Sequence, residues 1–128
     1  MKITEHFSRQ EFDCKDLQKT PYPAEWIETR LRPLCEALEL IRAQTGPLIV
    51  NSGYRTPEHN KRVKGAKNSP HIQGRAADIK CRGFTGQGLA DIAFALMKSG
   101  KIPMGGLGVY PNRIHYDTRG TFATWRGK

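Results

Sequence analysis

The sequence has few cysteines and no long apolar run, and these absences exclude several classes of protein. Its three cysteines, Cys14, Cys35 and Cys81, are odd in number and form no Cys-x-x-Cys pair. They argue against a disulfide framework and against a thiolate zinc site, and they predict reduced, partly buried thiols. No apolar stretch reaches the roughly 18 residues of a membrane-spanning helix, so the sequence predicts no such span.

The chain also shows no targeting segment, internal repeat or low-complexity stretch. The first residues, Met-Lys-Ile-Thr-Glu-His, lack the apolar core of a secretory signal peptide, so we expect synthesis in the cytoplasm. A chain of 128 residues is expected to form one domain, 1–128, with an N-terminal arm over 1–23. A domain of this size buries roughly two-thirds of its unfolded surface.

Acidic residues are scarce beside basic ones. The sequence has 21 Lys and Arg against 12 Asp and Glu, a formal net charge of +9. This charge favours a polyanionic partner, either nucleic acid or a bacterial cell wall with its carboxylates and phosphates. Because the basic residues are scattered, with no arginine-rich tail or aromatic-basic stripe, we expect no nucleic-acid partner. A nucleic-acid-binding protein remains an alternative that rests on charge alone.

Hydrophobic spacing predicts an α+β fold, with helices packed on a small, mainly antiparallel sheet. A helix is predicted over 24–44, where Pro33 either kinks it or marks the first turn of a second helix. Its apolar residues recur in steps of four and three: Ile27, Leu31, Leu34, Leu38 and Ile41. Further helices are expected over 58–63 and 87–99, strands over 48–50 and at Asp78, and a hairpin from 107–110 and 113–118. Trp125 is expected to close the core.

One stretch concentrates groups suited to metal binding. Ser69-Pro-His-Ile-Gln-Gly-Arg-Ala-Ala-Asp78 holds an imidazole at His71 and a carboxylate at Asp78, with Gly74 between them to allow a tight turn. If Asp78 lies on a strand, Ile79 faces the core and Asp78 faces a cleft. A second histidine, His115, follows in a strand-like alternation. Two imidazoles and one carboxylate are a usual ligand set for a catalytic zinc. The sequence therefore predicts that His71, Asp78 and His115 bind Zn²⁺.

The motif Ser-x-His-x-x-Gly-x-Ala-x-Asp, followed by His-x-Asp, resembles the M15-type zinc D-alanyl-D-alanine carboxypeptidases. Ser52-Gly-Tyr-Arg-Thr-Pro-Glu-His-Asn60 resembles another shared block of that family. The likeness runs from about Phe7 to Trp125, and the wider fold group includes lysostaphin-type enzymes and the hedgehog signalling domain. The resemblance implies a zinc metallopeptidase of peptidoglycan, a D,D-carboxypeptidase or an endopeptidase.

The resemblance also implies roles for residues around the metal. Arg55 is expected to face the substrate pocket, where its forked donors suit a peptide carboxylate or a developing oxyanion. Ser69 and Tyr54 are expected to contact substrate. His59 is expected to be structural or exposed to solvent, not a ligand.

The general base is where the sequence departs from better-known relatives. Many of them have an acidic residue three positions before the last zinc histidine or a histidine two before it, and here Asn112 and Arg113 stand there. Asp117 shares a strand face with His115 if the alternation holds. It is therefore either the base or an acceptor that orients a ligand imidazole.

These expectations lead to one main hypothesis and one alternative. The small size, lack of a signal and basic charge resemble phage or prophage lysis enzymes, which would act as monomers at the cell wall after release or as virion components. The main hypothesis is zinc-dependent hydrolysis of peptidoglycan stems or cross-links near a D-amino acid. The alternative is a catalytically silent, zinc-stabilised cell-wall binding or virion morphogenesis module, and the missing acidic residue at Asn112 motivates it.

Overall fold

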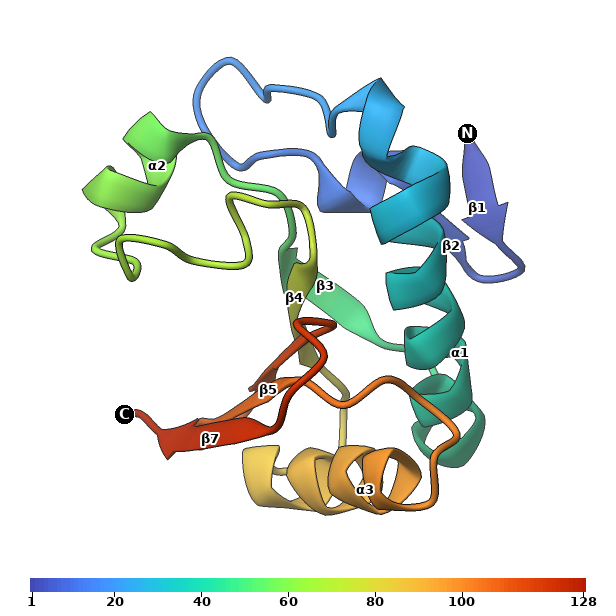
Figure 1. The fold of residues 1–128 in the computed structure, drawn as a ribbon. Helices are drawn as coiled ribbons and strands as arrows, with labels where there is room; N and C mark the ends of the chain where they lie inside the picture. Colours follow the sequence, from blue (N-terminus) through green and yellow to red (C-terminus); the bar gives the residue numbers. More distant parts are fainter.

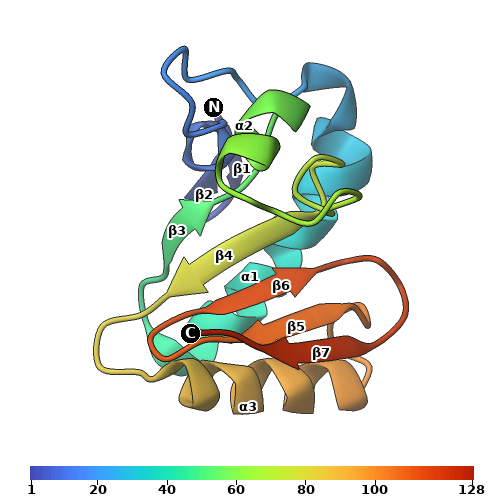
Figure 2. The ribbon, with the colours of Figure 1, turned by 90° about the vertical axis from the view of Figure 1, so that its left-hand side faces the viewer.

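A computed structural model describes all residues, 1–128, and confirms the α+β fold (Figure 1). Five strands form one sheet in the order β3-β4-β6-β5-β7, in which all neighbours are antiparallel except the parallel pair β5 and β7 (Figure 2). These strands are β3 (Ile49–Ser52), β4 (Ala76–Lys80), β5 (Gly106–Val109), β6 (Ile114–Asp117) and β7 (Ala123–Arg126). The three α-helices are α1 (Arg32–Thr45), α2 (Pro57–Arg62) and α3 (Gly86–Lys98).

The two faces of the sheet differ in chemistry. Ile79 of β4 and Ile114 and Tyr116 of β6 are fully buried in one core with apolar side chains of α1 and α3. Because side chains alternate along a strand, Asp78, His115 and Asp117 lie on the other face. In the antiparallel register Asp78 lies opposite His115. Pairing of the two strands thus brings two of the predicted ligands together.

The predicted helix over 24–44 is present in two parts. Residues 24–31 form a 3₁₀ turn, Ala24–Trp26, and a π-helical turn, Ile27–Leu31, before α1 begins at Arg32. Pro33 lies in the first turn of α1, directly after the π-helical turn, where the helical hydrogen-bond pattern changes. All five periodic apolar residues are buried: Ile27, Leu31, Leu34, Leu38 and Ile41. The spacing therefore identified the buried face, and proline marks the start of the α-helix.

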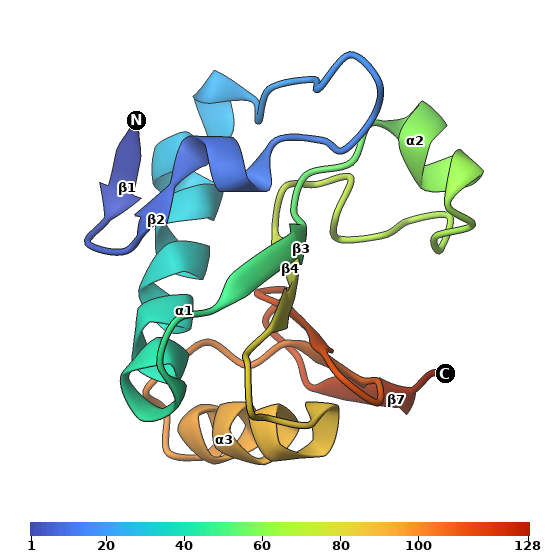
Figure 3. The same ribbon diagram turned by 180° about the vertical axis from the view of Figure 1, so that it is seen from behind.

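The N-terminal residues are more regular than the expected arm. Strands β1 (Lys2–Thr4) and β2 (Phe7–Ser8) pair beside α1, and a 3₁₀ turn, Arg9–Phe12, follows (Figure 3). The Ser8 N–H donates to Glu11 Oε1 at 2.8 Å, as expected of a capping box. Phe7 and Phe12 are buried in the core, which explains why the segment is held against the domain.

The C-terminal segment differs most from expectation. The hairpin of β5 and β6 forms, but β7 is an additional strand, and Trp125 does not close the core. Its half-buried ring lies 5.0 Å from the His115 ring, centroid to centroid. Trp125 is in register with Gly108, where an added Cβ would come within 2.6 Å of the indole nitrogen. The bare backbone of this glycine leaves room for the indole on the open face.

Two further expectations concern cysteines and membrane spans. Cys14, Cys35 and Cys81 are all buried and free. No helix has both the length and the apolar character that crossing a membrane requires.

Candidate metal centre

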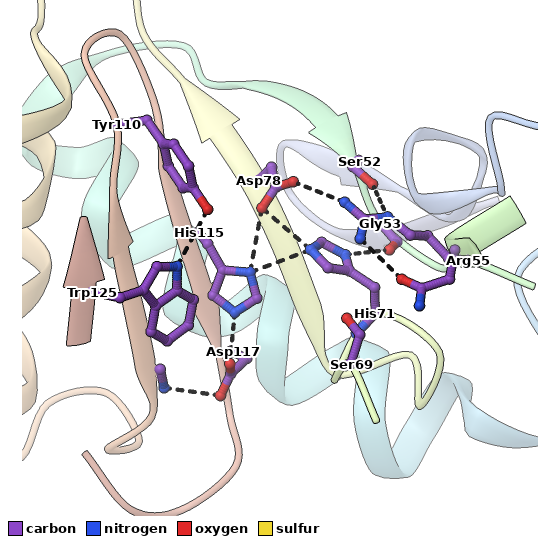
Figure 4. A network of polar contacts seen from close by, with 12 residues as sticks. Ser52, Gly53, Arg55, Ser69, His71, Asp78, Tyr110, His115, Asp117 and Trp125 are labelled. Atoms are coloured by element: carbon purple, nitrogen blue, oxygen red, sulfur yellow. Dashed lines mark hydrogen bonds and ion pairs between the residues drawn. The ribbon is translucent and has the colours of Figure 1, made fainter. Parts of the chain in front are cut away.

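Three side chains from separate parts of the chain converge on one point (Figure 4). His71 lies in the loop after α2, Asp78 in β4 and His115 in β6. His71 Nε2 lies 3.2 Å from Asp78 Oδ1, His115 Nδ1 lies 3.2 Å from His71 Nε2, and His115 Nδ1 lies 3.3 Å from Asp78 Oδ1. The structure therefore brings together the three residues that the sequence predicts as ligands.

In each imidazole the outer nitrogen, which faces away from the other two candidate ligands, has a hydrogen-bond partner. This partner fixes the protonation of the inner nitrogen, which faces those ligands. His71 Nδ1 lies 2.7 Å from the Gly53 carbonyl oxygen, which can only accept a hydrogen bond. His115 Nε2 lies 2.6 Å from Asp117 Oδ2, also an acceptor when ionised. Each outer nitrogen therefore donates its proton, and a neutral ring directs the lone pair of its inner nitrogen toward Asp78 Oδ1. Burial lowers the pKa of His71, which favours the neutral ring. Burial acts in the same direction on His115, but its hydrogen bonds with Asp117 and Asp78 outweigh burial and raise its pKa, so a bound cation rather than burial would keep that ring neutral.

This donor set fits a tetrahedral zinc ion. Zinc–nitrogen and zinc–oxygen distances of roughly 2.0–2.1 Å in a tetrahedron place neighbouring ligand atoms about 3.3 Å apart. The three observed separations, 3.2, 3.2 and 3.3 Å, match that value. Three lone-pair-bearing atoms at this spacing repel one another unless a cation or protons lie among them. The geometry and the chemistry of the donors thus both suit a metal ion.

Arg55 contacts the carboxylate of this set. Its Nη2 lies 3.3 Å from Asp78 Oδ2, and its other donors reach Ser52 Oγ at 3.2 Å and Asn60 Oδ1 at 3.1 Å. Burial alone would raise the pKa of Asp78, but its contacts with His115 and His71 outweigh burial and hold the pKa well below its usual range. The carboxylate is therefore ionised, with one oxygen toward the histidines and the other toward Arg55.

Asp117 lies behind His115 and is fully buried. Besides His115, its oxygens accept hydrogen bonds from the Gly106 N–H at 2.9 Å and from Arg119 Nε at 2.9 Å and Nη2 at 2.8 Å. Burial would raise its pKa, but the hydrogen bonds from His115, Arg119 and Gly106 lower it well below its usual range. Asp117 is not among the residues that line the cavity over the metal centre. Its position matches the orienting role more closely than that of a base facing substrate.

The loop that carries His71 is held by contacts from distant segments. Gly74 has φ = +70°, which confirms the tight turn expected there. The Tyr22 hydroxyl donates to the Gly74 carbonyl at 2.6 Å, and the His71 N–H donates to Ser69 Oγ at 3.1 Å. A Cβ on residue 74 would lie 2.7 Å from the Tyr22 hydroxyl oxygen. The turn therefore needs glycine for both conformation and space.

A cavity of about 490 Å³ lies over the three ligands. Arg55 and Ser69 line it, as the sequence analysis expected, but Tyr54 does not. The Tyr54 ring packs instead against Tyr22 and Trp26, with centroids 6.1 and 6.0 Å away. His59 lies on α2 and is no member of the metal-binding group; its Nδ1 is buried without a hydrogen-bond partner.

Sequence reasoning missed one aromatic residue of the cavity wall, Trp125, and left Tyr110 open between packing and the pocket wall. Tyr110 and Trp125 both line the cavity, and the Trp125 Nε1–H donates to the Tyr110 hydroxyl at 3.2 Å. The available signal was the Gly106-Leu-Gly108 alternation in β5, which leaves one face of that strand without side chains.

An α+β domain with a His-Asp-His donor set beneath an open polar cavity has the design of a metallopeptidase. The sequence profile of the Peptidase M15 family matches residues 5–117, and the chain belongs to that family. Its members are zinc peptidases, so the resemblance seen in the sequence is confirmed at the level of family and metallopeptidase class. No curated protein gives a significant match.

Proposed function

We propose that the protein is a zinc-dependent peptidase that cleaves peptide bonds in peptidoglycan stems or cross-links, near a D-amino acid. The observation that carries this proposal is the convergence of three donor atoms at 3.2–3.3 Å, with both histidines oriented by acceptors on their far sides. His71, Asp78 and His115 would hold the zinc. When bound, zinc lowers the pKa of a water ligand to about 7 and polarises the scissile carbonyl.

The residues around the metal centre are assigned either to substrate binding or to the orientation of a metal ligand. Arg55 lies beside Asp78 with a forked guanidinium, and we assign it to a substrate carboxylate or to the oxyanion that develops at the scissile carbonyl. Ser69 Oγ accepts from the backbone of His71, so its own proton is free to donate into the cavity. We assign Asp117 to the orientation of His115 through Nε2 and not to proton transfer with substrate. Tyr54 packs against Tyr22 and Trp26 outside the cavity, and we assign it no contact with substrate.

Charge supports a cell-wall substrate. The net charge of +9 and the arginines at the cavity suit a polymer rich in carboxylates. The small chain and basic surface also fit a lysis or virion enzyme that acts at the wall as a monomer. The masses of the released products distinguish removal of a terminal residue from cleavage of a cross-link.

The test is digestion of purified cell walls with the zinc-loaded protein, followed by mass spectrometry of the released muropeptides. We expect one bound zinc per chain, new free amino groups, and loss of cleavage when zinc is chelated. A His115→Ala variant that neither binds zinc nor cuts provides the control for contaminating hydrolases. A protein that binds one zinc but releases no product from several wall chemotypes contradicts the proposed activity.

One observation favours a second candidate, a zinc-stabilised wall-binding module without turnover. Asp78 is the only carboxylate among the residues that line the cavity, and Asn112 stands exposed in the turn between β5 and β6. No free carboxylate therefore faces the metal centre as a base. Co-sedimentation with cell walls distinguishes the two, because a silent module binds walls when loaded with zinc yet leaves their muropeptide pattern unchanged.

A further inference from the structure

We infer that the cavity selects peptide stems with an additional free carboxylate near the cleaved bond, such as diaminopimelate in place of lysine. This inference rests on the proposed function and concerns its substrate. Diaminopimelate and lysine share a carbon chain and an ammonium group, and differ by one carboxylate at the far end. A site that distinguishes them must respond to that single negative charge.

The side chains that line the cavity are strongly unbalanced in charge. Four are cationic: Arg55, Lys64, Arg113 and Arg119. The only anionic one is Asp78, whose charge is directed at the histidines and at Arg55. A metal ion held by two neutral histidines and one carboxylate would add a further positive charge. The cavity therefore favours anions.

Two of these cations have partners and two do not. Arg55 pairs with Asp78, and Arg119 pairs with the buried Asp117 at 2.8 Å. Lys64 and Arg113 form no ion pair within the chain. Their charges are therefore available to a ligand in the cavity.

The Arg113 side chain and the Lys64 backbone are each held by a contact within the chain. The Arg113 guanidinium lies over the Tyr110 ring, 4.2 Å from its centroid, so its position is restrained at the cavity wall. Lys64 has φ = +60°, held by a hydrogen bond from its N–H to the Lys61 carbonyl at 3.1 Å. The next residue, Gly65, lies so close to Arg55 that an added Cβ would be 2.8 Å from Nη1. The Lys64 backbone is thus adjacent to the arginine that contacts the metal ligand.

Complementary charge at such positions contributes to selectivity. Charge pairs at partly exposed sites contribute modestly, and two such pairs together are expected to give roughly a tenfold preference, about 1.4 kcal/mol. Complementary charge also raises association rates at low salt. We therefore expect about tenfold higher kcat/KM for the diaminopimelate stem, with the preference falling as salt is added.

The experiment compares three soluble stem peptides that are identical except at the third residue: diaminopimelate, its side-chain amide, and lysine. The amide keeps the shape of diaminopimelate and removes its charge. Cleavage rates and equilibrium binding are both measured on the zinc-loaded protein. We expect the free carboxylate to be preferred about tenfold over both other peptides in each measurement.

Charge-reversal variants test which residues cause the preference for the peptide with the free carboxylate. Lys64→Glu and Arg113→Glu should each reduce or reverse it, whereas Lys101→Glu, an exposed residue outside the cavity, should not. The inference is overturned if the three peptides are cleaved and bound equally well, or if the preference for the free carboxylate is unchanged in both variants. If no peptide is cleaved while the diaminopimelate peptide still binds most tightly, the hydrolase proposal fails and the charge selection stands.

Discussion

Replacing Asp117 with asparagine separates the two roles that the sequence left open for this residue. The carboxylate accepts on two sides: Oδ1 from the Gly106 and Arg119 N–H groups, and Oδ2 from His115 Nε2 and Arg119 Nη2. An amide has one oxygen and one NH₂ group. Its oxygen is expected to replace Oδ1, where two backbone N–H groups are fixed, so the NH₂ group faces His115.

The substitution is expected to weaken zinc binding because it changes the preferred tautomer of His115. With a donor at its outer nitrogen, the imidazole must accept there and carry its proton on Nδ1, the atom that faces Asp78 and His71. Metal binding must then reverse this preference. Loss of such an outer partner typically costs 10–100-fold in metal affinity, about 1.4–2.7 kcal/mol. We expect a weakening of zinc binding in this range and recovery of most cleavage when excess zinc is supplied.

The assay is competition for zinc with a chromophoric chelator, paired with wall cleavage at saturating zinc. Asp91→Asn, an exposed change of the same charge on α3, is the matched control. Thermal unfolding of the zinc-loaded variants checks that the domain is intact. If Asp117→Asn binds zinc as tightly as the native chain but loses about a thousandfold or more in cleavage at saturating zinc, Asp117 acts as the base. The orienting role would then be wrong.

Three further predictions concern the cavity wall, the loop and the N-terminal hairpin. Tyr110→Phe should lower kcat by about 100-fold with zinc content unchanged, because the Trp125 N–H already occupies the hydroxyl oxygen and leaves its proton for substrate. Tyr22→Phe should lower the free energy of unfolding by about 1 kcal/mol and speed zinc release, because the buried Gly74 carbonyl loses its donor. Burial raises the pKa of Glu39, but hydrogen bonds from the hairpin outweigh it and keep the pKa below 4.5. Its stabilisation is therefore present above pH 4.5 and lost as the pH falls through the lowered value, so Glu39→Gln should cost about 1 kcal/mol at pH 7 and little at strongly acid pH in thermal melts.

Each of these predictions has an outcome that contradicts it. Unchanged kcat in Tyr110→Phe would remove the hydroxyl from catalysis. Zinc release at the native rate from Tyr22→Phe would show that the loop holds His71 without this contact. A stability difference between Glu39→Gln and the native chain that is the same at pH 7 and at acid pH would exclude titration of Glu39 as its cause. Glu36→Gln, on the same helix, is the matched control for loss of one charge.

The three candidate metal ligands could be predicted because the sequence blocks that resemble the M15 family connect positions that are distant in the sequence. His71 and Asp78 lie on one turn-and-strand segment, and the alternation of β6 puts His115 on the same face of the sheet as Asp117. The antiparallel register then sets Asp78 opposite His115. A short motif and a period of two residues were sufficient to indicate this face.

The aromatic residues could not be assigned in the same way, because their positions depend on pairings between distant segments. Trp125 reaches the site only because β7 adds in parallel beside β5, a pairing that no local pattern indicates. Tyr54 follows the predicted strand as expected, but Tyr22 and Trp26 from the N-terminal third occupy the space around its ring and keep it outside the cavity. Each of these positions depends on a contact partner far away in the sequence.

The glycines of β5 explain how a strand next to β6 can leave the metal centre accessible. Gly106 and Gly108 lie on the same face as His115 and Asp117, and neither has a side chain to cover them. A Cβ at 106 would collide with the Asp117 carboxylate and Arg119, and one at 108 would collide with the Trp125 indole. The first glycine therefore admits the pair that orients His115, and the second admits the aromatic wall of the cavity. The same face of one short strand thus provides space both for the support of a candidate metal ligand and for the aromatic wall of the cavity.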